Sequence, residues 1–213
     1  PPPAPRRPPA SVSTSTRTEP AVPVTTGSHP PTASGAEVTP PLPTAQLART
    51  PRVIDSRDEY LAAVAELAAA SGPVAVDAER ASGFRYSQRA YLIQVFRRGA
   101  GTFLFDPPAI GSFTELQAAI GGEEWVLHAA SQDLPCLREV GLDPEALFDT
   151  ELGARLAGLL RVGLGAVVED TLGLHLAKEH SAADWSTRPL PAAWLTYAAL
   201  DVELLLDVRD RIA

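Results

Sequence analysis

The sequence has few of the residues that define several classes of site. It contains a single cysteine, Cys136, which excludes a disulfide framework and a cysteine-based zinc site. It has no uninterrupted apolar run near the roughly 18 residues of a membrane span, and its N-terminus lacks the apolar core of a signal peptide. These absences predict a cytoplasmic protein without a membrane partner. Because the chain begins at Pro1 and has no methionine, we expect it to be a fragment of a longer protein.

Residues 1–52 have no tryptophan, tyrosine or phenylalanine, but they hold 14 of the 21 prolines and 14 serine or threonine residues. Such a segment has too little apolar surface to offset the entropy lost on ordering. We therefore predict a disordered tail over 1–52 and a folded domain over 53–213. The tail is interpreted as a linker, and no proline motif in it identifies a protein partner.

The folded domain also lacks a surplus of basic side chains. Residues 53–213 carry 13 basic and 24 acidic residues. Nucleic-acid-binding domains usually have a basic face, so this balance predicts modest intrinsic affinity for nucleic acid. A site built from acids changes this argument, because bound cations reverse the local potential.

The hydrophobic pattern predicts a mixed sheet with helices on both faces. Strands are expected at 73–77, 91–96, 102–106, 125–128 and 146–149, the second and third forming an antiparallel meander. Helices are expected at 57–70, 112–120, 131–140, 150–160, 164–173 and from about 191 to the C-terminus. Cys136 falls in the third helix and is interpreted as a small buried hydrophobic residue.

Acidic side chains follow the predicted elements at three places. Asp77 and Glu79 lie two residues apart at the end of an apolar strand, so their side chains leave the same face. Such a pair is often simply solvated, but on a central strand the two carboxylates would repel unless a cation or proton lay between them. Asp133 begins a helix, where an acid is favoured by the helix dipole in any case.

The third acidic signal lies near the C-terminus. Tyr197 and Asp201 are four residues apart on a helix and therefore share one face. They fit either a tyrosine hydrogen-bonded to an acid in the core or a metal ligand beside a water-orienting phenol. Oxygen ligands without cysteine suit Mg²⁺ or Mn²⁺. Four such acids can hold two divalent metal ions, the equipment for cutting a phosphodiester.

These segments resemble the exonuclease domain of the ribonuclease D family. The resemblance rests on Val-Asp77-Ala-Glu79, on Leu127-His-Ala-Ala-Ser-Gln-Asp133-Leu and on Tyr197-Ala-Ala-Leu-Asp201-Val. Between the last two, Phe148-Asp149-Thr150 and Asp184-Trp185-Ser-Thr-Arg188-Pro189-Leu190 also match family segments in the family's order. The match covers the predicted globular domain from end to end.

The resemblance implies a ribonuclease H-like fold, with a five-stranded mixed sheet flanked by helices. It implies that Asp77 bridges two metals, that Glu79 and Asp201 complete the shell of the first, and that Asp133 holds the second through water. Tyr197 would orient the attacking water. The reaction would release nucleoside 5′-monophosphates from single-stranded RNA 3′ ends, as in trimming of tRNA precursors.

The resemblance extends less firmly to four neighbouring residues. Arg188 and Lys178 are candidate contacts for substrate phosphates, although an exposed cation is more often a solvated charge. His128 and Gln94 fit the family pattern and are expected to support the site. Where relatives often have an aromatic residue after the second acid, this chain has Arg80. The helical nucleic-acid-binding domains of the family are expected to be absent from this chain.

Three rival functions remain open at this point. A DNA exonuclease of the same superfamily would use the same metal chemistry, and recognition of the ribose 2′-hydroxyl separates the two. A non-catalytic nucleic-acid-binding or scaffold domain would have no need for all four acids and the tyrosine. A small-molecule phosphohydrolase would instead turn over mononucleotides.

Overall fold

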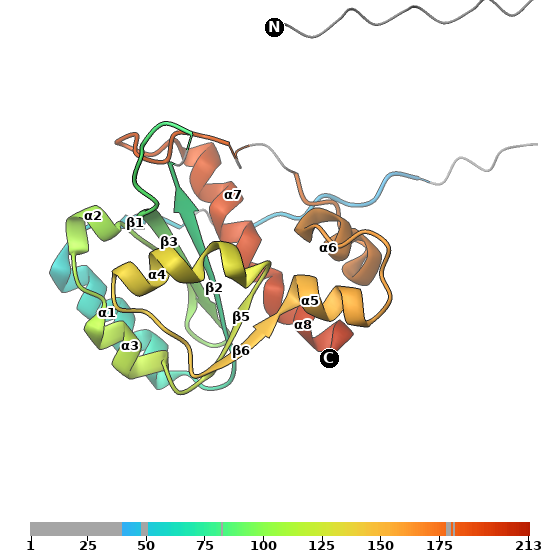
Figure 1. Cartoon of the computed structure of the whole chain (residues 1–213), viewed down its shortest axis with the longest axis horizontal. Coiled ribbons are helices and arrows are strands. Elements are labelled where there is room, and N and C mark those ends of the chain that lie inside the picture. The colour runs from blue at the N-terminus through green and yellow to red at the C-terminus, as the bar shows by residue number, and fades with distance from the viewer. Residues whose placement is uncertain (1–39, 48–50, 82, 178–179, 181) are drawn as a thin grey trace, which may run out of the picture. The chain divides into compact units, whose positions relative to one another are not determined.

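A computed structural model describes residues 40–47, 51–81, 83–177, 180 and 182–213. Among these residues, one six-stranded sheet has the strand order β1-β4-β3-β2-β5-β6 (Figure 1). Its strands are β1 (Val53–Ile54), β2 (Val74–Arg80), β3 (Ala90–Arg97), β4 (Gly101–Phe105), β5 (Glu124–Leu127) and β6 (Ala146–Asp149). The predicted number of five strands was wrong because β1, only two residues long, adds an edge strand parallel to β4. A two-residue strand has no periodicity to detect.

The sheet combines antiparallel and parallel pairing. Strands β2, β3 and β4 form the antiparallel meander expected from the sequence. Strands β2, β5 and β6 are parallel, with Val74 paired to Trp125 and Leu127 paired to Asp149. The carboxyl ends of these three parallel strands therefore meet at one edge of the sheet, where loops bearing polar residues can converge.

The helices are α1 (Arg57–Ala69), α2 (Pro107–Ile110), α3 (Thr114–Ile120), α4 (Leu134–Glu139), α5 (Thr150–Leu156), α6 (Leu164–Leu172), α7 (Ala192–Glu203) and α8 (Leu205–Ile212), with a 3₁₀ turn η1 (Ala130–Gln132). The predicted helix at 131–140 is thus interrupted before α4, which has a proline in its first turn, where the missing N–H has no helical partner to lose. The C-terminal helix is divided at Leu204. Among the described residues, no helix has both the length and the apolarity needed to cross a membrane.

The two faces of the sheet bury different sets of side chains. Val74 and Val76 belong to a core that includes Tyr60 and Leu67 of α1, whereas Ala75, one residue out of phase, packs with Val202 and Leu205. Helices α1, α3 and α4 accordingly cover one face, and α7 and α8 cover the other (Figure 1). Alternation along β2 therefore directs its odd-numbered side chains towards α7 and α8.

Residues 40–47 pack on the globular domain, although their composition places them in the predicted tail. The Ala45 N–H donates to the His175 carbonyl at 2.9 Å, and the His175 N–H donates to the Pro43 carbonyl at 2.8 Å. Ala45 is 8% exposed and joins a hydrophobic cluster with Val167 and Val168 of α6. The compact unit accordingly begins at Pro40. Of the predicted disordered tail, residues 1–39 and 48–50 lie outside the described residues.

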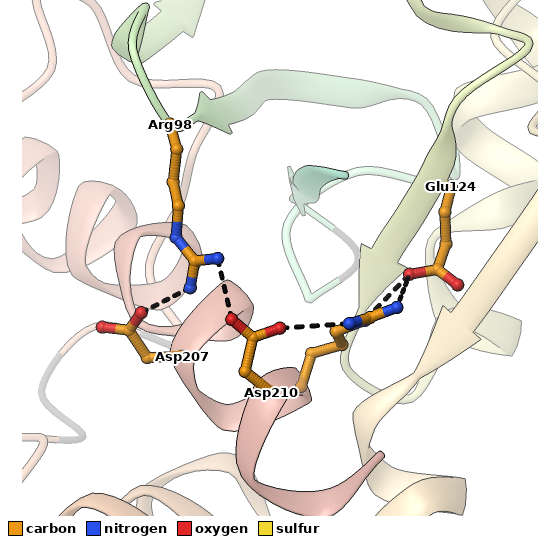
Figure 2. Close-up of polar contacts among 5 residues, drawn as sticks. Arg98, Glu124, Asp207 and Asp210 are labelled. Atoms are coloured by element: carbon orange, nitrogen blue, oxygen red, sulfur yellow. Dashed lines mark hydrogen bonds and ion pairs between the residues drawn. The ribbon is translucent and has the colours of Figure 1, made fainter. Parts of the chain in front are cut away.

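Ion pairs connect α8 to the sheet (Figure 2). Arg98, in the turn after β3, pairs with Asp207 at 2.6 Å and with Asp210 at 2.8 Å. Arg209 pairs with Asp210 at 3.1 Å and with Glu124 of β5 at 2.9 Å. Each pair is partly solvated, so each contributes little to stability alone, but the four contacts form one network. The network links α8 to two separate parts of the sheet.

Candidate active site

Three carboxylates meet where α7 crosses the carboxyl end of β2. Asp77 and Glu79 project from β2 and Asp201 from α7, and one oxygen of each lies within 4.8 Å of the others. The helix can approach because its sheet-facing residues include Ala198 and Ala199, both fully buried. The pairing register shifts after Glu79, where the strand departs from regular pairing with β3. Such irregularities commonly redirect side chains next to active sites.

The fourth acid, Asp133, is held beside them by the turn that follows β5. In this turn Ala129 has a φ of 55°, a left-handed conformation that is uncommon for a residue with a Cβ. The Asp149 carboxylate accepts hydrogen bonds from the N–H groups of Ala129 at 3.0 Å and Ala130 at 2.9 Å. It also accepts one from the Glu151 N–H at 2.9 Å, capping α5. Asp149 therefore stabilises the turn that carries Asp133.

A pocket of about 300 Å³ opens over the acids. Its lining includes the four acids, Tyr197 and His128, together with further residues of β2, η1, α6 and α8: Asp77, Ala78, Glu79, Arg80, His128, Ala129, Gln132, Asp133, Leu164, Tyr197, Asp201 and Leu205. Asp133 is only 6% exposed, and its Oδ1 lies 3.7 Å from Nη2 of Arg80. The pocket thus joins four acids to one phenol and one guanidinium group.

The carboxyl groups in this pocket retain protons more strongly than free carboxylic acids. Burial, together with the charge of Asp77, raises the pKa of Asp133 to about 8, whereas Arg80 opposes the rise. Burial likewise raises the pKa values of Glu79 and Asp201, and the charge of Asp77 adds to both. Burial also raises the pKa of Asp77. The cluster is therefore electrostatically unfavourable when fully ionised and would be relieved by a cation.

Tyr197 lies one helical turn before Asp201 and contributes a protonated phenol. Burial raises its pKa above the ordinary range, and the charges of Asp201 and Glu79 act in the same direction. A hydrogen bond joins the side chains of Tyr197 and Asp201. The phenol consequently stays protonated at any pH at which the acids ionise.

Two further predicted residues lie close to the acids. Nδ1 of His128 is 2.9 Å from Oγ1 of Thr150, and the ring lines the pocket. Gln94 is directly opposite Asp77 in the β2–β3 register, so the two side chains leave the same face. Gln94 is fully buried, and among the described residues neither of its amide atoms has a hydrogen-bond partner. A buried unpaired amide is unusual and points to a role at the site.

Arg188 is not part of the pocket lining. The Arg188 guanidinium donates to the Asp106 carboxylate at 2.6 Å and to the carbonyl oxygens of Trp185, Thr187 and Tyr91 at 2.8, 2.7 and 2.8 Å. These contacts favour a structural role for Arg188 over a phosphate contact. Lys178 lies outside the described residues.

Two residues of the site received no role from the sequence. Arg80 stands out in the sequence only as a departure from the family pattern, yet it is the cation next to Asp133. Asp149 stands out only within a matching segment, although its position before a helix could have signalled a cap for α5. Its bonds to Ala129 and Ala130 join residues about 20 positions apart, which no local pattern reveals. Cys136, by contrast, is buried as predicted, and burial raises its pKa to about 12.

The donor set suits a hard divalent cation. Asp77, Glu79 and Asp201 offer only oxygen atoms, close enough together to share one ion, in surroundings that disfavour three uncompensated charges. Carboxylate oxygens are the preferred ligands of Mg²⁺ and Mn²⁺. The residues present therefore fit a metal site, and Asp133 lies near enough to Asp77 to share a hydrogen bond with it.

Comparison with known proteins identifies the class. A family model described as 3′-5′ exonuclease matches residues 51–213, so the chain belongs to this family. Within the family, its exonuclease domain is ribonuclease D-like. The chain is 33% identical over 159 residues to ribonuclease D of Escherichia coli, covering 73% of this chain and 42% of that protein. It is 32% identical over 159 residues to ribonuclease D of Cronobacter turicensis, covering 73% of this chain and 43% of that protein.

Solved structures agree with this assignment and with the ribonuclease H-like fold. A protein from Bifidobacterium adolescentis is 49% identical, with a TM-score of 0.78 over 82% of this chain and 43% of that one. The catalytic core of RRP6 from Trypanosoma brucei is 28% identical, with a TM-score of 0.70 over 82% and 49%. Escherichia coli RNase D is 31% identical, with a TM-score of 0.65 over 76% and 44%. The chain thus spans less than half the length of these proteins.

Proposed function

We propose that this domain is a metal-dependent 3′→5′ exoribonuclease that releases nucleoside 5′-monophosphates from RNA 3′ ends. The observation that carries the proposal is the convergence of Asp77, Glu79 and Asp201 within 4.8 Å, beside Asp133 and Tyr197, in a domain of the 3′-5′ exonuclease family. A scaffold domain has no use for a buried acid cluster that destabilises it when ionised.

Each residue has a role that follows from its position. Asp77, Glu79, Asp133 and Asp201 would hold two divalent ions, Mg²⁺ or Mn²⁺. When bound, such ions lower the pKa of water and neutralise charge on the leaving oxygen. The protonated phenol of Tyr197 would orient the attacking water, since it lines the same pocket and donates to Asp201. Gln94, opposite Asp77, and His128, in the pocket lining, would support the arrangement of the acids.

The choice of RNA rests on the relatives. Escherichia coli RNase D is described as an exoribonuclease involved in structured RNA processing, and it shares 31% of aligned residues with this chain. We therefore favour RNA 3′ ends, with tRNA precursors as a candidate substrate, and action in the cytoplasm. DNA is the alternative substrate, because the same acids would cleave it.

The proposal is tested with a 5′-labelled single-stranded RNA incubated with Mn²⁺, Mg²⁺ or EDTA, with a DNA strand of matching sequence alongside. We expect a metal-dependent ladder that shortens from the 3′ end, faster on RNA than on DNA. A faster ladder on DNA would favour the alternative. Exonuclease function would be contradicted by two results together. Both RNA and DNA would stay intact with either metal, and Mn²⁺ would not stabilise the protein in a thermal melt.

A further inference from the structure

The segment that connects β2 to β3 has a composition unlike the rest of the domain. Residues 80–89 contain Arg80, Arg85 and Arg89 and no acidic residue, whereas residues 53–213 have 13 basic and 24 acidic side chains. The same segment contains Phe84 and Tyr86. Basic side chains interleaved with aromatic ones are typical of surfaces that bind single-stranded nucleic acid, since every base has a face on which an aromatic ring can stack.

The two aromatic side chains are exposed rather than packed. Phe84 is 57% exposed and Tyr86 is 109% exposed, relative to a fully accessible residue. Phenylalanine normally buries most of its ring in a core, so an exposed ring beside another exposed ring is not explained by folding. Burial in a complex would remove this apolar surface from water.

Phe84 also borders the active site. It lines a second pocket, of about 260 Å³, together with Ala78, Glu79, Arg80, Gly83, Ala182 and Ala183. Ala78, Glu79 and Arg80 also line the pocket that contains the acids, so the two pockets adjoin along the end of β2. A chain whose 3′ end lies at the acids can therefore reach Phe84 without leaving the surface.

A contact fixes this segment relative to the opposite wall. Nε of Arg85 donates to Oγ of Ser186 at 3.1 Å, across 101 residues of sequence. Ser186 in turn donates to Asp184 Oδ1 at 2.5 Å. The segment is thereby tied to residues 184–186, which directly follow the pocket-lining residues Ala182 and Ala183 in the sequence. Two segments that line or flank this pocket, around residues 83–85 and 182–186, are therefore connected by hydrogen bonds.

We propose that residues 83–89 form the binding surface for single-stranded RNA next to the scissile phosphate, with Phe84 stacking on one of the last bases. This proposal rests on the proposed function and extends it to the substrate contact. Arg85 and Arg89 supply positive charge on a domain whose net charge is negative, and the ring supplies contact without base specificity. The surface explains how an acidic domain holds an anionic strand at its acids.

The test is the dissociation constant of a 5′-fluorescein-labelled single-stranded RNA 12-mer, measured by anisotropy at low salt in EDTA, where metal-dependent cleavage cannot consume it. Phe84→Ala is expected to raise this constant about 5- to 150-fold, the range for loss of one base–aromatic stack. Phe84→Trp should bind as the unchanged chain does. Leu160→Ala is the matched control, because Leu160 is 100% exposed and lines neither pocket.

An RNA with an abasic nucleotide locates the contact. When the missing base is the one stacked on Phe84, the penalty of Phe84→Ala should vanish, and it should persist for abasic sites elsewhere. The proposal is overturned if Phe84→Ala binds within twofold of the unchanged chain, if Leu160→Ala weakens binding equally, or if the unchanged chain binds no RNA. A protein partner for this surface would give the first of these results.

The two proposals fail separately. RNA binding that depends on Phe84, with intact RNA in Mn²⁺, would retain the surface and contradict the exonuclease. Cleavage from the 3′ end with unchanged binding by Phe84→Ala would retain the exonuclease and contradict the surface.

Discussion

Asp149 fixes the left-handed backbone conformation of Ala129. This residue lies in the turn that carries Asp133 into the active site. Oδ1 of Asp149 accepts from the Ala129 N–H at 3.0 Å, and among the described non-glycine residues only Ala129 has a positive φ. Replacing Asp149 with alanine leaves the N–H groups of Ala129 and Ala130 without their acceptor and removes the cap of α5. We expect Asp149→Ala to lower the free energy of unfolding by about 3 kcal/mol, measured by urea denaturation.

Asparagine at the same position is the control. Its single carbonyl oxygen can still serve Ala129 and Glu151, which share Oδ1, but not Ala130, which uses Oδ2. Asp149→Asn should therefore lie between the alanine variant and the unchanged protein. Equal stability of all three proteins would show that the turn does not depend on this carboxylate.

Gln94→Leu should separate activity from stability. The amide is buried without a described partner, so its removal should leave the free energy of unfolding unchanged or raise it by up to about 2 kcal/mol. The rate of RNA cleavage should fall at least about tenfold, because Gln94 lies opposite Asp77 and supports the site. Leu104→Met, at the other cross-strand neighbour of Gln94, is the control. A destabilised, fully active Gln94→Leu variant would show a structural role instead.

Much of the site follows from local rules, and the remainder depends on tertiary contacts. Strand alternation places Asp77 and Glu79 together, and helical spacing places Tyr197 beside Asp201. No pattern in the sequence shows that these two pairs belong to one site. Only the resemblance to a family joins them. The crossing of α7 over β2, which brings them within reach, depends on packing of Ala198 and Ala199.

The elements that differ from prediction depend on partners distant in sequence. The strand β1 exists because β4 pairs with it, and residues 40–47 are ordered by hydrogen bonds to the segment around His175. A proline-rich composition reports local preference only, so it cannot reveal docking of this kind. The same holds for the buried acids. The sequence shows which acids are present, but their raised pKa values arise from burial in the folded chain.

The raised pKa of Asp133 should make the metal-free protein less stable as the pH rises. An unfolded aspartate has a pKa near 4, whereas burial raises the pKa of Asp133 to about 8. Between these values the folded state binds a proton that the unfolded state has released, so its relative stability falls as the pH increases. Below about pH 4 this penalty is absent, and above about pH 8 it is complete.

Thermal melts in EDTA from pH 5 to 8.5 test this dependence. Asp133→Asn should flatten the decline and raise the melting temperature at pH 8, because the amide carries no charge. Asp143→Asn, at an exposed aspartate 59% accessible, should leave the slope unchanged. The account of the buried charge is wrong if Asp133→Asn has the same pH dependence as the unchanged protein.

Tyr197→Phe should slow cleavage while metal binding persists. The phenol donates to Asp201, and its removal leaves the clustered carboxylate oxygens of Asp77, Glu79 and Asp201 in place. We expect a rate about a hundredfold lower in single-turnover cleavage at saturating Mn²⁺, at the lower end of the effect of a proton-handling group. The Mn²⁺ affinity from calorimetry should change little. Tyr60→Phe, on the opposite face of the sheet, controls for loss of a hydroxyl and should keep the full rate.

The most direct test of the account is cleavage of 5′-labelled RNA by Asp77→Asn, with a thermal melt of the same protein in EDTA. Asp77 raises the pKa values of three neighbouring acids by its charge, and the family resemblance implies that it would hold both metals. We predict a loss of activity of at least about a hundredfold, together with an unchanged or higher melting temperature. Cleavage at the rate of the unchanged chain would contradict the proposed site.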